Sequence, residues 1–139
     1  MEDFDKLKMQ KDAIDELNDF AAVQRVARRM WQVAADHGFH DADGVELQSA
    51  SSLSVGRIAT FIANLHGECS ELWEACRKDA MNSLCDKLGC KLTNAEEELA
   101  DIIIRAMDTA YSLGIHIGDA IAEKTRYNRN RPHMHGKKC

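Results

Sequence analysis

Apolar residues recur at spacings of three and four along most of this 139-residue chain, which is the period of an amphipathic α-helix. The clearest stretches cover residues 18–35, 55–78, 93–113 and 117–128. A weaker repeat over 1–17 predicts either a further helix or an ordered arm. The pattern therefore predicts an all-α fold with four to five helices.

Short polar residues and glycines predict where the first helix begins and ends. Asn18 or Asp19 is expected to be its N-cap, because a side-chain oxygen there can accept a hydrogen bond from the first turn. Gly38 is expected to end it. The segments 39–54 and 79–92 lack a helical period and are expected to be connections.

A capping box is predicted at the start of the third long stretch. Thr93 or Asn94 is followed three positions later by Glu96 or Glu97, and this spacing lets two side chains satisfy two backbone N–H groups at a helix start. Gly114 is expected to terminate the same helix.

The composition fits one domain that spans residues 1–139. Hydrophobic residues make up 45% of the chain and there is one proline, so a single helical core is expected. No apolar run reaches the length of a membrane span, and the N-terminus is acidic, so we expect a cytoplasmic protein without membrane contact. The cysteines, which follow no zinc or disulfide spacing and are expected to be free thiols, are Cys69, Cys76, Cys85, Cys90 and Cys139.

Charge is divided unevenly along the chain. All 23 acidic residues lie in 1–123, whereas 124–139 carries six basic residues and no acidic one. The basic C-terminal tail, 129–139, suits a nucleic-acid arm, a solvated end, or a clamp for an anionic ligand. The acidic body makes extended nucleic-acid binding the weakest of these, and no nucleic-acid partner is expected.

Two acidic pairs stand within apolar helical patterns. Glu68 and Glu71 form the first, and Glu98 and Asp101 form the second. Same-sign pairs at this spacing occur elsewhere in the chain, so spacing alone is a weak signal. Glu68 differs because it lies within the apolar stripe of its helix, where a solvated glutamate would not belong.

Carboxylates at positions i and i+3 lie close enough to bind one ion or two neighbouring ions. Two such helices side by side would present oxygen ligands that suit Mg²⁺ or Mn²⁺ and suit Zn²⁺ poorly. The competing interpretation is that these acids form surface salt bridges. The basic residues available for that are Arg57, Arg77, Lys78 and Arg105.

At this level of detail the chain resembles the MazG-like nucleoside triphosphate pyrophosphohydrolases of the all-α NTP pyrophosphatase superfamily. The resemblance covers most of 18–138 and rests on IANLHGECSELWEACRK, on NAEEELADIIIRAMDTAYSLGI and on AIAEKTRYNRNRPHMHGKK. The family's ExxE and ExxD motifs fall on the two acidic pairs. Its downstream motif is matched by Lys124, Asn128, Arg131, Pro132, His135, Gly136, Lys137 and Lys138.

The resemblance implies Mg²⁺-dependent hydrolysis of a nucleoside or deoxynucleoside triphosphate between the α and β phosphates, for which Mn²⁺ can substitute for Mg²⁺. It implies that the four acidic residues hold the metal and take part in catalysis. It further implies that Lys124, Asn128 and Arg131 steady the triphosphate, with Arg77 as a further phosphate contact. A homodimer or homotetramer is implied, and helices that are apolar on more than one face also favour homo-oligomerisation.

Several alternatives stay open. The same fold acts on phosphoribosyl-ATP, or on dUTP and dUDP, in related families. A non-enzymatic helical interaction module would use the acids as salt-bridge partners and the basic tail as a binding arm. Arg77 equally suits a salt bridge to Glu74. Trp31, Phe39 and Trp73 can stack on a base or pack in a core or subunit contact.

Overall fold

The computed structural model describes residues 2–40, 55–87 and 89–132, with side chains from residue 5 onward. These residues form helices α1 (Glu2–Asp36), α2 (Val55–Arg77), α3 (Asn94–Ser112) and α4 (Ile117–Arg129). The prediction of an all-α fold is confirmed. Most of the predicted connection 39–54 and of the basic tail 129–139 lies outside the described residues.

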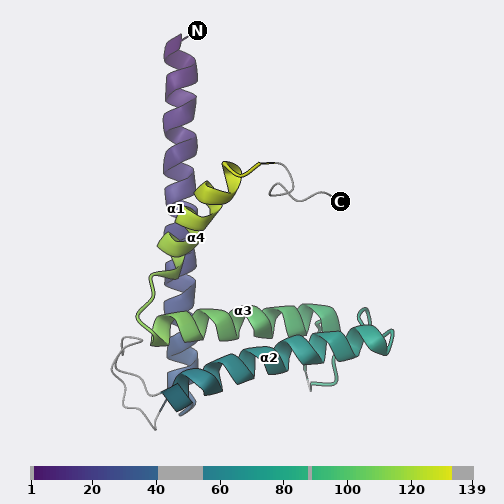
Figure 1. Ribbon diagram of the computed structural model, residues 1–139. Helices are drawn as coiled ribbons and strands as arrows, with labels where there is room; N and C mark the ends of the chain where they lie inside the picture. Colours follow the sequence, from purple (N-terminus) through teal and green to yellow (C-terminus); the bar gives the residue numbers. More distant parts are fainter. Residues whose placement is uncertain (1, 41–54, 88, 133–139) are drawn as a thin grey trace.

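The helices pack as two pairs, α2 with α3 and α1 with α4, and α1 also packs against α3 (Figure 1). Helices α2 and α3 lie side by side and antiparallel, and this pair crosses the C-terminal half of α1. Helix α4 runs back along α1 in the opposite direction, and the Arg129 guanidinium lies 2.8 Å from a Glu16 carboxylate oxygen. Contact between α3 and α4 is slight, so α1 connects the two parts of the molecule.

Helix α1 is continuous over 35 residues, and the predicted N-cap at Asn18 or Asp19 is wrong. No glycine or proline interrupts Glu2–Asp36, and residues of high helix propensity fill it. Both polar residues are exposed on the surface of an uninterrupted helix. Of the two predictions for 1–17, a helix or an ordered arm, the helix is the one observed from residue 2 onward, and it is part of α1.

The capping box at the start of α3 is confirmed. The Thr93 hydroxyl oxygen accepts a hydrogen bond from the Glu96 N–H, and the Glu96 carboxylate accepts one from the Thr93 N–H at 2.8 Å. Gly114, which follows the C-cap residue, has φ of 67°, a conformation that glycine adopts without steric cost. The boundaries of α3 therefore follow from local sequence signals.

The core lies where α2 and α3 cross α1. Trp31 of α1 is buried, so its predicted alternative of packing in the core is the one observed. The His40 ring stacks on it with 5.6 Å between centroids, and His40 Nε2 lies 2.8 Å from Asp108 Oδ1 on α3. This buried pair attaches the end of the α1 segment to α3.

Large apolar side chains remain exposed on α2 and α3. On α3, Leu99 is 49% and Ile103 is 53% exposed, although the sequence pattern places both on an apolar face. Trp73 on α2 is 63% exposed. A single chain thus leaves part of its predicted apolar surface in water, which is costly at about 25 cal/mol per Å².

None of the helices in the described part of the chain combines the length and the apolar character that crossing a membrane requires. Helix α3 separates its apolar and polar residues most clearly, yet it carries acidic residues on its buried side.

Helix α4 lies close to α1 at Gly118. Its backbone N–H donates a hydrogen bond to the Gln24 side-chain oxygen at 3.3 Å. A Cβ atom at this position would overlap the carbonyl oxygen of Phe20. Only glycine lets the two backbones come this close, so the α1–α4 packing depends on this position.

We expect Gly118→Ala to lower the free energy of unfolding by about 1–3 kcal/mol, because the added methyl group must push α4 away from α1. Gly67→Ala is the matched control, since a Cβ atom there meets nothing within 4 Å. In the middle of α2 that change should raise stability by about 0.5–1 kcal/mol. Urea denaturation followed by circular dichroism measures both. Equal effects of the two variants would contradict the close approach.

Candidate metal centre

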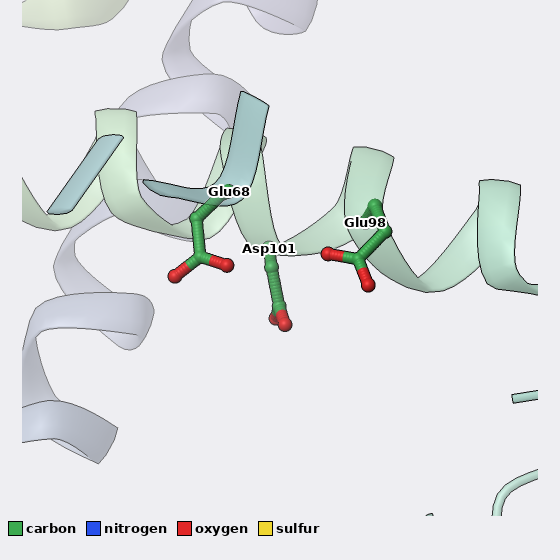
Figure 2. Close-up of side chains that lie close together, drawn as sticks. All are labelled: Glu68, Glu98 and Asp101. Atoms are coloured by element: carbon green, nitrogen blue, oxygen red, sulfur yellow. The ribbon is translucent and has the colours of Figure 1, made fainter. Parts of the chain in front are cut away.

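Three carboxylate side chains converge between α2 and α3. Glu68 comes from α2, and Glu98 and Asp101 come from α3, one helical turn apart. One oxygen atom from each lies within 4.8 Å of the others. Figure 2 shows Asp101 between the two glutamates, with all three carboxylates directed to the same side. The antiparallel pairing of the helices thus brings together residues that lie 30 or more positions apart in sequence.

Glu71, the fourth predicted ligand, is exposed on α2 and does not belong to this convergent group. Its charge nevertheless acts on the group, because after burial it is the largest cause that raises the pKa of Glu98. Glu71 therefore lies beside the three converging carboxylates. The structure brings three of the four predicted ligands together and places the fourth at their edge.

Of the three converging carboxylates, Glu98 is the most buried. Its residue exposure is 9%, and its Oε2 atom is buried without a hydrogen-bond partner among the described residues. Burial, followed by the negative charges of Glu71, Asp101 and Glu68, raises the pKa of Glu98, although Lys87 opposes the rise. A buried carboxylate oxygen in this position is stabilised by a proton or by a cation.

Two basic side chains already neutralise part of the cluster. The Arg105 Nε atom donates a hydrogen bond to Glu68 Oε1 at 2.9 Å, so the salt-bridge interpretation holds for this pair. Lys87 contacts Glu97 and lies 3.4 Å from Asp101 Oδ2. Desolvation lowers the pKa of Lys87, but the charges of Asp101, Glu98 and Glu71 more than offset this and the pKa is raised.

Sequence reasoning missed both Lys87 and Glu97. Lys87 belongs to the connection 79–92, which has no helical period to place it. Glu97 precedes the ExxD motif and reads as part of the capping box. The available signal was weak: a lysine lies between two acidic pairs along the chain and could have been proposed as their counter-charge.

The donor chemistry of the cluster is compatible with a hard divalent cation. Every converging group is a carboxylate, and one buried oxygen has no hydrogen-bond partner within the described ranges. Mg²⁺ and Mn²⁺ prefer such oxygen donors, whereas Zn²⁺ prefers nitrogen and sulfur. Glu68, Glu98 and Asp101 are the residues that could hold such an ion, with Glu71 available at the edge.

The predicted phosphate-binding residues lie in α4, and just after it in the case of Arg131. Lys124, Asn128 and Arg131 are exposed, and the two cationic groups lie 4.9 and 5.7 Å from the centroid of the Tyr127 ring. Helix α4 follows α1 away from the α2–α3 pair (Figure 1). The fold of one chain therefore does not bring these residues to the acidic cluster.

The other predicted residues have varied surroundings. Arg77 Nε lies 3.3 Å from Glu74 Oε2, so the alternative salt bridge is the one observed. Phe39 and Trp73 are exposed. The end of the predicted motif lies outside the described residues; it comprises His135, Gly136, Lys137 and Lys138.

Comparisons with known proteins do not add to this picture. No protein-family model, no curated protein and no solved structure matches the chain. The likeness to MazG-like enzymes therefore stays a prediction that rests on the motif residues.

We expect Glu98→Gln to raise the melting temperature by a few degrees at neutral pH without divalent ions, because it removes a buried charge. The raised pKa of Glu98 means that folding favours its protonated form. The gain should therefore shrink as the pH falls toward the ordinary range of a glutamate and both proteins carry a neutral group. Calorimetry over a pH series measures this.

Glu123→Gln is the control for that comparison, because Glu123 is an exposed partner of Arg126 on α4. This change should alter the melting temperature little. A drop in melting temperature for Glu98→Gln at neutral pH would show that the charged carboxylate is stabilised in the folded chain.

Proposed function

We propose that the protein hydrolyses a nucleoside or deoxynucleoside triphosphate between the α and β phosphates, releasing the monophosphate and pyrophosphate with the help of Mg²⁺. The observation that carries this proposal is the convergence of Glu68, Glu98 and Asp101 from two antiparallel helices. The motif resemblance supplies the reaction class. We further propose that the activity serves nucleotide-pool housecleaning.

The proposed hydrolysis requires little covalent chemistry from the protein. When bound, Mg²⁺ or Mn²⁺ would offset the negative charge that develops on the phosphate oxygens. The carboxylates of the cluster would hold the ion, and one of the four acidic residues would accept the proton of the attacking water. Glu71 is exposed beside the cluster and can reach solvent more readily than buried Glu98.

The phosphate-binding groups in this proposal come from a second copy of the chain. Lys124 and Asn128 lie in α4 and Arg131 follows it, and α4 runs along α1 away from the α2–α3 pair that carries the cluster (Figure 1). Large apolar side chains of α3 are exposed, including Leu99 and Ile103. A homodimer that buries this surface could carry the cationic residues of one copy to the carboxylates of the other. A tetramer built from two such dimers would leave this arrangement unchanged.

One observation favours the non-enzymatic alternative. Arg105 and Lys87 already pair with Glu68 and Asp101, as they would in a helical interaction module. In such a module the exposed apolar residues would contact a partner protein. The two functions differ in their dependence on metal, because only the enzyme requires a divalent cation at the cluster.

The direct test is a panel of canonical and damaged nucleoside triphosphates, together with dUDP and phosphoribosyl-ATP, assayed for the released products with Mg²⁺. We expect pyrophosphate and a monophosphate from at least one triphosphate. Glu98→Gln and Asp101→Asn should each lower kcat/KM by about a hundredfold or more, with unchanged helical content. Glu123→Gln is the control and should retain activity.

The outcomes separate the candidate functions. Turnover of phosphoribosyl-ATP or dUDP alone would keep the fold and reaction type but change the substrate. Retained activity in both cluster variants would remove the carboxylates from the catalytic site. Absence of turnover, together with no rise in melting temperature from Mg²⁺ and a non-hydrolysable triphosphate, would favour the interaction module.

A shared site predicts complementation between inactive variants. Asp101→Asn lacks a cluster residue and Arg131→Ala lacks a phosphate-binding residue, so each alone should be nearly inactive. Co-refolded in equal amounts, they should regain about a quarter of the wild-type activity, because half of the dimers are mixed and one of their two sites is intact. Activity measured against mixing ratio checks this. No recovery would place both residues in the same chain's site.

A further inference from the structure

Four basic residues lie between positions 117 and 132, and two of them are neutralised by carboxylates. The Arg126 guanidinium pairs with Glu123 one turn earlier in α4, and both carboxylate oxygens lie 2.7 Å from Arg126 Nη2. The Arg129 Nη1 atom lies 2.8 Å from Glu16 Oε1 on α1. Each of these two positive charges therefore has a negative charge beside it.

The other two basic residues, Lys124 and Arg131, share one aromatic neighbour. The Lys124 Nζ atom lies 4.9 Å, and the Arg131 Cζ atom 5.7 Å, from the centroid of the Tyr127 ring. A cation at such a distance is attracted by the electrons of the ring face. Neither side chain forms an ion pair with a carboxylate in the part of the chain that the structure describes. The ring of Tyr127 is thus the shared contact of two positive charges.

The end of α4 explains how a residue beyond the helix reaches this ring. The Asn130 N–H donates a hydrogen bond to the Tyr127 carbonyl at 3.2 Å, and the Arg131 N–H donates to the Asn128 carbonyl at 3.1 Å. The Asn130 side-chain amide also donates to the Arg126 carbonyl at 3.1 Å. These bonds continue the coil of the chain in a tighter form past the last helical residue. Arg131 therefore stays on the side of the helix that carries Tyr127, four positions earlier.

The helix dipole alone does not account for this arrangement. Positive charges near the C-terminal end of a helix are favoured by the dipole, which acts on Arg126 and Arg129 as well. That interaction requires no aromatic side chain. Core packing does not explain the ring either, because Tyr127 is 58% exposed. Holding the two cationic groups is a role that accounts for an aromatic residue at this exposed position.

Two positive charges that contact the same ring attract a ligand with several anionic oxygens. The Lys124 ammonium and the Arg131 guanidinium repel each other, and an anion that contacts both relieves this repulsion. Lysine binds a phosphate oxygen as a point charge, whereas the planar guanidinium of arginine donates two parallel hydrogen bonds to phosphate. A polyphosphate chain presents oxygens to both groups at once.

We propose that Tyr127 is a positioning residue, whose ring holds the Lys124 ammonium and the Arg131 guanidinium together as a clamp for the phosphate oxygens of the substrate. Lys124 and Arg131 would touch the phosphates, and Tyr127 acts through them. The identity of the anion rests on the proposed function. The motif residues that carry the resemblance to MazG-like enzymes do not include Tyr127, so its role follows from the contacts of its ring.

The expected effect of the ring is on the binding of the substrate. Lysine and arginine have long side chains, and a ligand that binds them must immobilise both. Contacts with the ring restrict both side chains before the ligand arrives, so less conformational entropy is lost on binding. This gain is the same in the bound substrate and in the transition state, because the triphosphate contacts the clamp in both. Loss of the ring should therefore raise KM and leave kcat nearly unchanged.

The first test compares steady-state kinetics of the whole chain on a triphosphate that the wild type hydrolyses. Tyr127→Leu should raise KM about fivefold at similar kcat, whereas Tyr127→Phe, which keeps the ring, should stay within about twofold of wild type. Arg126→Gln is the matched control, because Glu123 already neutralises that charge. Circular dichroism checks that all variants are folded. An unchanged KM in Tyr127→Leu, or an equal rise in Tyr127→Phe, would overturn the role of the ring while leaving the proposed function intact.

The second test does not depend on turnover. Inorganic pyrophosphate is titrated into the same proteins by calorimetry, at low ionic strength and without divalent ions. Tyr127→Leu and Arg131→Gln should each bind it about fivefold more weakly than wild type, whereas Tyr127→Phe and Arg126→Gln should bind it as wild type does. No binding to the wild type, or equal binding by all four variants, would overturn the clamp. The expected pattern in a protein that hydrolyses no triphosphate would contradict the proposed function and support the clamp.

Discussion

The constraint on which the structure depends is the repulsion among carboxylates that α2 and α3 hold together. Glu68, Glu98 and Asp101 converge within 4.8 Å, and Glu98 is buried. Such an arrangement is unfavourable unless positive charge accompanies it. The chain supplies Arg105 at Glu68 and Lys87 at Asp101, while Glu98 Oε2 has no hydrogen-bond partner in the described part of the chain. The existing positive charges thus leave one oxygen of Glu98, the most buried of the three converging carboxylates, without a hydrogen-bond partner among the described residues.

The two cationic groups differ in how firmly the fold holds them. Arg105 lies on α3 itself, one turn after Asp101, so it stays near the cluster whenever the helix is formed. Lys87 reaches the cluster from the connection, and its side chain is well exposed. A charge held on a helix serves the stability of the helix pair. A charge held on a loop can be exchanged for another cation at a smaller structural cost.

Local signals in the sequence predicted the elements, and non-local contacts explain what was missed. The period of apolar residues placed the helices, and the capping box at Thr93 located the start of α3. The break expected at Asn18 was wrong because a polar residue caps a helix only where the preceding chain leaves the helical conformation. Three cluster residues were predicted from their place in the apolar helical pattern and from the motif resemblance, whereas the Lys87–Asp101 and Glu68–Arg105 contacts join residues 14 and 37 positions apart. Periodicity carries no information on such pairs.

The proposed homodimer would explain two features of the single chain. Exposed Leu99 and Ile103 lie on the same helix as the acidic cluster, where solvent contact is unfavourable. The cationic residues of α4 lie apart from the acidic cluster, and a bound triphosphate would have to contact both. A helical partner of another kind would account for the apolar surface alone. A homodimer would account for both, because it covers the apolar residues and brings a second α4 within reach of the carboxylates. The separation of charges within one chain is thus the stronger argument for self-association, since exposed apolar residues by themselves do not specify what covers them.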